Sequence, residues 1–316
     1  MLVIGMVIAC CAAAWLCLLP LPVPPQYYNG IVLPRAGRWF ADSYLSMCVN
    51  MACTGGIGLI MSAINRTFSL HRTQTALDSS MFLAMMLAMP TLLMGFNTGT
   101  LLALVVLVCM FLLYGTYADP GATRPVFLIF LLLSAMSMTQ YSYLIYVPVF
   151  IVGVMQMRIF TARALTACVL GLVTPWWILG ALSLAVPVRI DIPDFSLFLT
   201  AFSLQDNLKL IITVAFIGLL TVGCWMLNVP QMIAYNAHRR AYNGTLSVVS
   251  LATLLSVLCD FSNFSVYAPL LAVCASFQLG RLLGGRPTRG NVIAAYTLLA
   301  VFLLIFLCYP VRLILS

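Results

Sequence analysis

The sequence predicts an all-α fold: a polytopic transmembrane helix bundle of about 10–11 spans with its N-terminus inside, forming one integral membrane domain over residues 1–316. Hydrophobic residues make up 63% of the chain, charged residues make up 7%, and the mean hydropathy is +1.10. A soluble domain carries roughly 25% charged residues, so this chain has too few charged residues to form a surface that is exposed to water. Apolar runs of about 20 residues, the length that crosses a bilayer, follow one another along it.

The first apolar run, residues 1–20, lacks the basic leader of a signal peptide and is expected to be a retained span. Residues 21–42 are rich in proline and aromatic residues and should lie along the membrane surface, because tyrosine and tryptophan favour the head-group level. A very short turn at Asn97 is expected to join the third and fourth spans. The later spans are predicted at about 43–64, 76–96, 98–114, 126–138, 143–157, 164–186, 208–229, 246–258, 266–283 and 292–307.

The distribution of basic residues predicts the orientation of these spans. The connections on the side of the N-terminus carry ten of the fifteen Lys and Arg residues and two acids. The connections on the other side carry five basic residues and five acids. Since Lys and Arg in short loops mark the cytoplasmic side, this pattern predicts a multi-pass protein of the cell inner membrane.

Composition also excludes several kinds of site. All seven acids are aspartates, so no mechanism that needs a glutamate is available. The two histidines, His71 and His238, lie in separate connections, and the eleven cysteines form no CXXC pair, so no metal and no cofactor are expected. The net charge of +8 fits the positive-inside pattern, and we expect no nucleic-acid partner. The expected partners are membrane lipids and other membrane proteins.

The first candidate for chemistry follows the first span. Asp42 is a candidate catalytic residue, with Arg35 and Arg38 as candidate substrate-binding residues. Multi-span glycosyltransferases that use lipid-linked sugars place an acid in a similar outward loop, usually in a tighter motif that often contains glutamate. The alternative is structural: Asp42 begins the second span as a helix cap and pairs with Arg38.

Asp260 is the second candidate catalytic residue, with Asn263 as a candidate substrate-binding residue. Ionisable residues at membrane depth are costly and often functional. The alternative is a turn residue at the outer edge of the bilayer, where water removes that cost. If Asp42, Asp260 and Arg38 met in one outward cavity, a two-carboxylate site would result.

A third group, Arg158, Arg163 and Arg281, flanks predicted spans on the basic side. Basic residues at this position are attracted to anionic lipid, so we expect them to be topological anchors. Polar residues within the spans are expected to form interhelical hydrogen bonds. These residues are Asn50, Gln156, Asn228 and Gln278.

The order of features over the second to seventh spans resembles a family of uncharacterised Bacteroidota polytopic inner-membrane proteins, a domain of unknown function. The features are the Asn-led basic loop Ile64–Arg72, Pro90, the segment Tyr143–Phe160, the Arg158/Arg163 turn and the stretch Gly171–Pro175. The resemblance implies an inner-membrane envelope protein without an assigned activity. It supplies no catalytic residues.

Three functions remain open from the sequence. The favoured one is an inner-membrane protein of unassigned activity, acting as an envelope or assembly component. The second is a membrane glycosyltransferase-like enzyme that uses a lipid-linked substrate at the outer face and requires Asp42. The third is a solute or lipid transporter, although the scarcity of charges inside the spans argues against ion coupling.

Overall fold

The computed structural model describes residues 31–70, 77–184, 204–230, 235–284 and 288–307, with Gly5 and Ala12. The predicted first span and most of the connection between the seventh and eighth spans lie outside these residues. Within them the fold is all-helical, with ten α-helices and four short 3₁₀ segments. The α-helices are α2 (Ser43–Phe68), α3 (Leu77–Leu87), α4 (Thr98–Tyr114), α5 (Thr123–Ser137), α6 (Tyr146–Gln156), α7 (Ala162–Ser183), α8 (Leu204–Asn228), α9 (Ala237–Cys259), α10 (Phe264–Gly284) and α11 (Arg289–Leu307). The 3₁₀ segments are η1 (Ala36–Arg38), η2 (Pro90–Leu92), η3 (Tyr141–Ile145) and η6 (Phe261–Asn263).

The lengths and composition of these helices identify a multi-pass membrane protein. Six helical segments of the described residues are long and apolar enough to cross a bilayer. They are Ser43–Phe68, Ala162–Ser183, Leu208–Asn228, Ala237–Cys259, Phe261–Gly284 and Arg289–Leu307. Large apolar side chains of these helices, such as Trp177 and Leu219, are exposed on the outside of the bundle, which suits a lipid environment.

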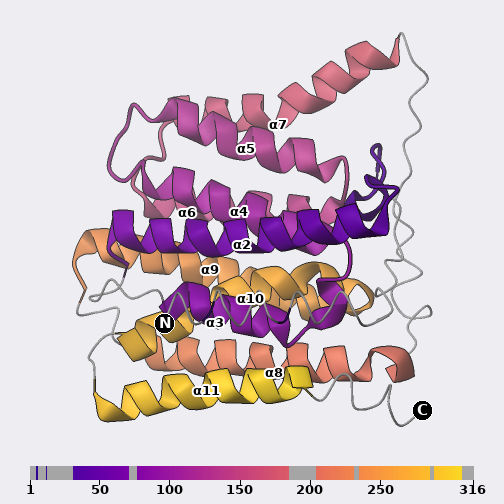
Figure 1. Ribbon diagram of the computed structural model, residues 1–316. Helices are drawn as coiled ribbons and strands as arrows, with labels where there is room; N and C mark the ends of the chain where they lie inside the picture. Colours follow the sequence, from indigo (N-terminus) through magenta and orange to yellow (C-terminus); the bar gives the residue numbers. More distant parts are fainter. Residues whose placement is uncertain are drawn as a thin grey trace.

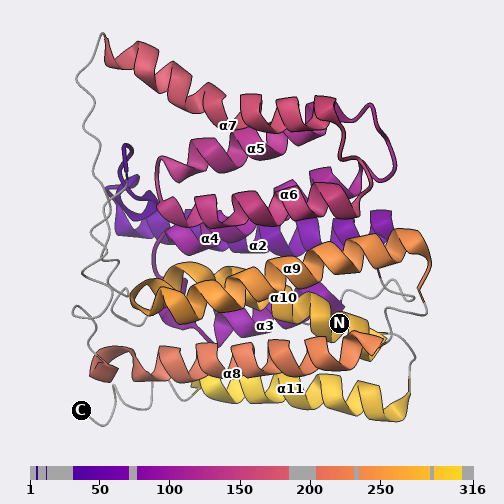
Figure 2. The same cartoon turned by 180° about the vertical axis from the view of Figure 1, so that it is seen from behind.

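The helices lie roughly along one common axis, and consecutive helices run in opposite directions (Figures 1 and 2). We call the end where α2, α4, α8 and α10 begin the pocket end, and the opposite end the basic end. The described basic residues divide unequally between them. The basic end carries Arg66, Arg124, Arg158, Arg163, Arg239, Arg240, Arg281 and Arg289, whereas the pocket end carries Arg35, Arg38 and Lys209.

Helix α10 forms the centre of the bundle (Figure 1). It packs against α3, α4, α8, α9 and α11, and it is buried along nearly its whole length. Its close approach to α4 depends on Gly99, where a Cβ atom would lie 2.7 Å from the carbonyl oxygen of Val266. Small residues permit such close helix contacts in membranes.

Helices α5 and α7 form an outer pair on one side of the bundle (Figure 1). At Gly171 the backbone of α7 touches that of α5, and the Ser134 hydroxyl on α5 donates a hydrogen bond of 2.6 Å to the Leu172 carbonyl. Pro175 lies inside α7 one turn later, and the second half of α7 bends away from α5 in Figure 1. A proline removes one helical hydrogen bond and commonly bends a helix in this way.

The structure corrects two predicted spans. The third span does not extend over 76–96, because α3 ends at Leu87 and a buried, largely non-helical connection of residues 88–97 follows. Met89 has non-helical dihedrals, as expected for a residue that precedes a proline. The ninth span begins nine residues earlier than predicted, so His238, Arg239 and Arg240 belong to the first turn of α9 and not to a loop.

Candidate functional site

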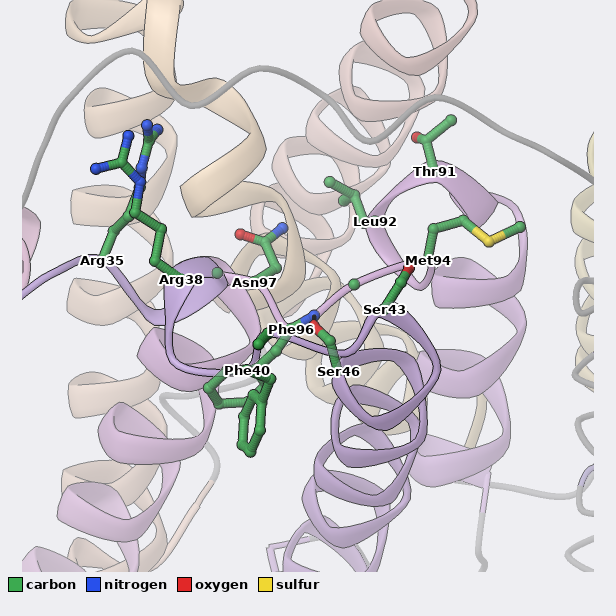
Figure 3. A pocket seen from close by; sticks show the side chains of 13 residues that line it. Arg35, Arg38, Phe40, Ser43, Ser46, Thr91, Leu92, Met94, Phe96 and Asn97 are labelled. Carbon is green, nitrogen blue, oxygen red and sulfur yellow. Dashed lines mark hydrogen bonds between the residues drawn. The ribbon is translucent and has the colours of Figure 1, made fainter.

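A short 3₁₀ turn places two arginines on the same side of the chain at the pocket end. Arg35 precedes η1 and Arg38 is its last residue, and the Arg38 amide donates to the Arg35 carbonyl at 2.9 Å. Side chains three residues apart in a 3₁₀ helix lie above one another. Figure 3 shows the two guanidinium groups side by side.

The connection 88–97 forms the facing wall of the site. Two polar side chains of α2 bind its backbone: the Ser46 hydroxyl accepts from the Phe96 amide at 2.8 Å, and the Asn50 amide donates to the Leu92 carbonyl at 2.8 Å. These bonds supply partners for buried backbone groups that no helix satisfies. The hydrogen bond predicted between Asn50 and another spanning helix is thus made instead to the short 3₁₀ segment η2 of this connection.

Between η1 and this wall lies a pocket of about 360 Å³. Its volume falls in the range of small-molecule sites, roughly 300–1,000 Å³. Aromatic rings close one side, because Phe96 contacts both Trp39 and Phe40 with ring centroids 5.9 and 5.6 Å apart. The lining residues are Arg35, Gly37, Arg38, Phe40, Ala41, Ser43, Ser46, Thr91, Leu92, Met94, Gly95, Phe96 and Asn97 (Figure 3).

The described lining of this pocket contains two arginines, Arg35 and Arg38, and no acid. Burial and the neighbouring Arg38 charge both lower the pKa of Arg35, burial having the larger effect. Two adjacent cations repel each other, and an anion placed between them would remove that repulsion. The guanidinium group suits phosphate and carboxylate groups because its donors form a planar fork.

Asp42 lies beside this pocket but is engaged elsewhere. Its carboxylate accepts a hydrogen bond of 3.1 Å from the Tyr44 amide and caps the N-terminus of α2. Asp42 is exposed, it is absent from the described pocket lining, and it forms no ion pair with Arg38, contrary to the pairing expected in the structural alternative. The structure thus shows the helix cap that the structural alternative predicted for Asp42. A catalytic role for Asp42 stays a prediction.

The replacement Asp42→Ala should therefore lower stability while leaving ligand binding at the pocket unchanged. Loss of an N-cap costs about 0.5–2 kcal/mol. The free energy of unfolding can be measured by titration with sodium dodecyl sulfate in mixed micelles, and Asp42→Asn, which can still cap, should restore most of it. Loss of ligand binding with unchanged stability would instead indicate a direct role in the site.

Asp260 lies at the same end of the bundle, between α9 and η6, in a dense hydrogen-bonded network. One carboxylate oxygen accepts from the hydroxyls of Tyr141 and Tyr267, the latter at 3.0 Å. The other accepts from the Asn263 amide at 3.0 Å and the Ser262 hydroxyl at 3.4 Å. Four donors fill the capacity of a carboxylate.

The structure confirms one part of the alternative expected for Asp260 and corrects another. Asp260 is a turn residue between α9 and η6, but it is only 4% exposed, so protein side chains and not water surround its carboxylate. Asn263 does lie beside Asp260, but the pocket contains neither of them. The structure thus brings Arg35 and Arg38 together and Asp260 and Asn263 together, as two separate groups.

Arg281 also differs from its predicted position. It was expected to be a lipid-facing anchor at the edge of its span, but it lies in the last turn of α10 and is only 3% exposed. Arg158 and Arg163 are exposed at the α6–α7 turn, where an anchor would lie. Hydropathy could not show that Arg281 is buried, because it reports the apolar run and not the contacts between helices.

No group of three potential metal ligands occurs among the residues that the structure describes. Comparison with known proteins adds no family and no activity: no family model, no curated protein and no solved structure matches the chain. The resemblance to the uncharacterised Bacteroidota family stays a prediction. The site must therefore be interpreted from its own geometry.

Proposed function

We propose that this membrane protein binds the phosphate-bearing head group of an anionic lipid in the pocket lined by Arg35 and Arg38, as an envelope or assembly component of a cell inner membrane. The observation that carries the proposal is the pair of adjacent guanidinium groups in a pocket whose described lining has no acid. Aromatic residues at the same site suit the head-group level of a bilayer. The positive-inside rule favours a cytoplasmic location for the basic end, with the pocket opposite.

The absence of an acid among the described lining residues favours binding over catalysis. A transferase would need a general base within hydrogen-bond reach of its acceptor. Asp42 caps α2, and the four donors to Asp260 occupy its carboxylate. Lipid binding by Arg35 and Arg38 needs no general base, whereas catalysis does. A lipid-linked sugar is one of the ligands to be tested.

The test uses the full-length protein in non-ionic detergent and short-chain phosphatidylglycerol as the probe. Native mass spectrometry should show bound phosphatidylglycerol in preference to phosphatidylcholine. The double variant Arg35→Gln/Arg38→Gln should bind it at least tenfold more weakly, since hydrogen bonds to charged groups contribute about 1.5–3 kcal/mol. The matched control is Arg289→Gln, an exposed arginine at the basic end.

Competition distinguishes the possible sources of the phosphate group. Displacement by inorganic phosphate alone would assign the site to a free anion and would contradict lipid retention. Preferential binding of a polyprenyl phosphate would support a lipid-linked substrate. Equal phosphatidylglycerol affinity in the wild type and the double variant would refute the proposal.

A further inference from the structure

A buried arginine lies at the basic end, far along α10 from the pocket end. Arg281 is 3% exposed, and its side chain lies between α10 and the end of α8. One guanidinium nitrogen, Nη2, donates to the Asn228 carbonyl at 3.3 Å. The Tyr235 ring centroid lies 5.3 Å from the guanidinium carbon. Both contacts are favourable, but neither the Asn228 carbonyl nor the Tyr235 ring carries a full negative charge at neutral pH.

Two further donor atoms of Arg281 have no hydrogen-bond partner among the residues that the structure describes. Its Nε and Nη1 atoms are buried and form no hydrogen bond. No ion pair joins Arg281 to any acid that the structure describes, including the buried Asp78 on the neighbouring helix α3. An unpaired buried charge ordinarily costs several kcal/mol, so a group of opposite charge is expected beside it.

Two neighbouring side chains add further unused polar atoms. The Asn228 amide nitrogen donates to the backbone and side-chain oxygens of Gln278, each at 3.0 Å. The Gln278 amide nitrogen and the Asn228 side-chain oxygen are buried and have no hydrogen-bond partner in the part of the chain that the structure describes. Among the described residues, the unpaired donor atoms of Arg281 and Gln278 therefore outnumber the one unpaired acceptor, the side-chain oxygen of Asn228.

We infer that Arg281, with Gln278, binds a small inorganic anion of the size of chloride between α8 and α10 at the basic end. The unpaired donors supply the hydrogen bonds, and the guanidinium supplies the charge. The near-complete burial of Arg281, Gln278 and Asn228 favours a compact ion over a lipid head group or a bulky oxyanion. This inference is independent of lipid binding at the opposite end.

The experiment measures chloride binding and its effect on thermal unfolding in detergent. Wild-type protein should bind radiolabelled chloride saturably, and its melting temperature should rise when chloride replaces gluconate at constant ionic strength, because a ligand of the folded state stabilises it. Arg281→Gln should abolish the binding or weaken it at least tenfold. The exposed Arg289→Gln at the same end is the control and should behave as the wild type.

Arg281→Lys covers the case in which Arg281→Gln does not fold. Lysine keeps the charge but lacks the planar fork of donors, so weaker chloride binding is expected. Three results would overturn the inference: no saturable binding to the wild type, unchanged binding in Arg281→Gln, or unchanged affinity in Arg281→Lys. Equal melting temperatures in chloride and gluconate would likewise count against a resident anion and in favour of water.

Discussion

Asp260→Ala is expected to destabilise the bundle by about 3 kcal/mol, since each buried polar group left without its partner costs about 1–3 kcal/mol. Removing the carboxylate takes the acceptor from Tyr141, Tyr267 and Asn263. Some compensation follows, because the Tyr267 hydroxyl also reaches Ser142 at 3.1 Å. The network joins η3 to the α9–α10 connection, so its loss should loosen two helix junctions together. Unfolding with sodium dodecyl sulfate in mixed micelles measures the free energy.

Asp119→Ala is the matched control for this change. Asp119 is an exposed aspartate whose carboxylate accepts from the Gly121 amide at 2.9 Å in a turn at the basic end. Its removal should cost less than about 1.5 kcal/mol, the net contribution of a typical hydrogen bond. Equal losses for the two variants would show that the Asp260 network contributes no more than a surface turn. If Asp260→Ala lost lipid binding but kept its stability, Asp260 would have a direct role in the binding site.

Gly171→Ala is expected to cost about 2 kcal/mol through overpacking between α5 and α7. The new Cβ atom would lie 2.6 Å from the Phe127 carbonyl oxygen and 3.0 Å from the Leu131 amide nitrogen. Both are backbone atoms, so no side-chain rotation can relieve the contact. The helices must separate, and the Ser134 bond to Leu172 should weaken with them. The unfolding free energy in mixed micelles again provides the measurement.

Gly180→Ala is a control on the same helix. Outside the backbone of its own helix, no described atom lies within 4 Å of a Cβ atom placed at Gly180. Only helix propensity therefore changes, and stability should stay constant or rise by up to about 1 kcal/mol. If Gly171→Ala were as stable as Gly180→Ala, the close backbone contact between α5 and α7 would not be required.

Much of the helical architecture follows from hydropathy, because each long apolar run in the described residues forms a helix. The failures occur where local chemistry overrides it. An apolar run passes through Met89 without a polar interruption, yet Pro90 ends the helix and leaves a buried connection. The first two turns of α9 contain Arg239 and Arg240, so their hydropathy resembles that of a loop.

The site was predictable only in part. Arg35 and Arg38 are three residues apart, so local spacing alone brings them together. The donors to Asp260 include Tyr141, more than a hundred residues away, and no sequence pattern links the two. Burial of Arg281 depends on the packing of α8 against α10. Such long-range contacts are set by tertiary packing and not by local sequence pattern.

The central position of α10 has a consequence for biogenesis. Helices α3 and α4 leave the ribosome long before α10, which they contact directly. At about 5–20 residues per second, the wait is on the order of ten seconds. During that time the α4 face around Gly99 must be covered by lipid, by an insertase or by a helix that α10 later displaces. The core of the bundle therefore closes only after α10 has been synthesised, well after α3 and α4 have entered the membrane.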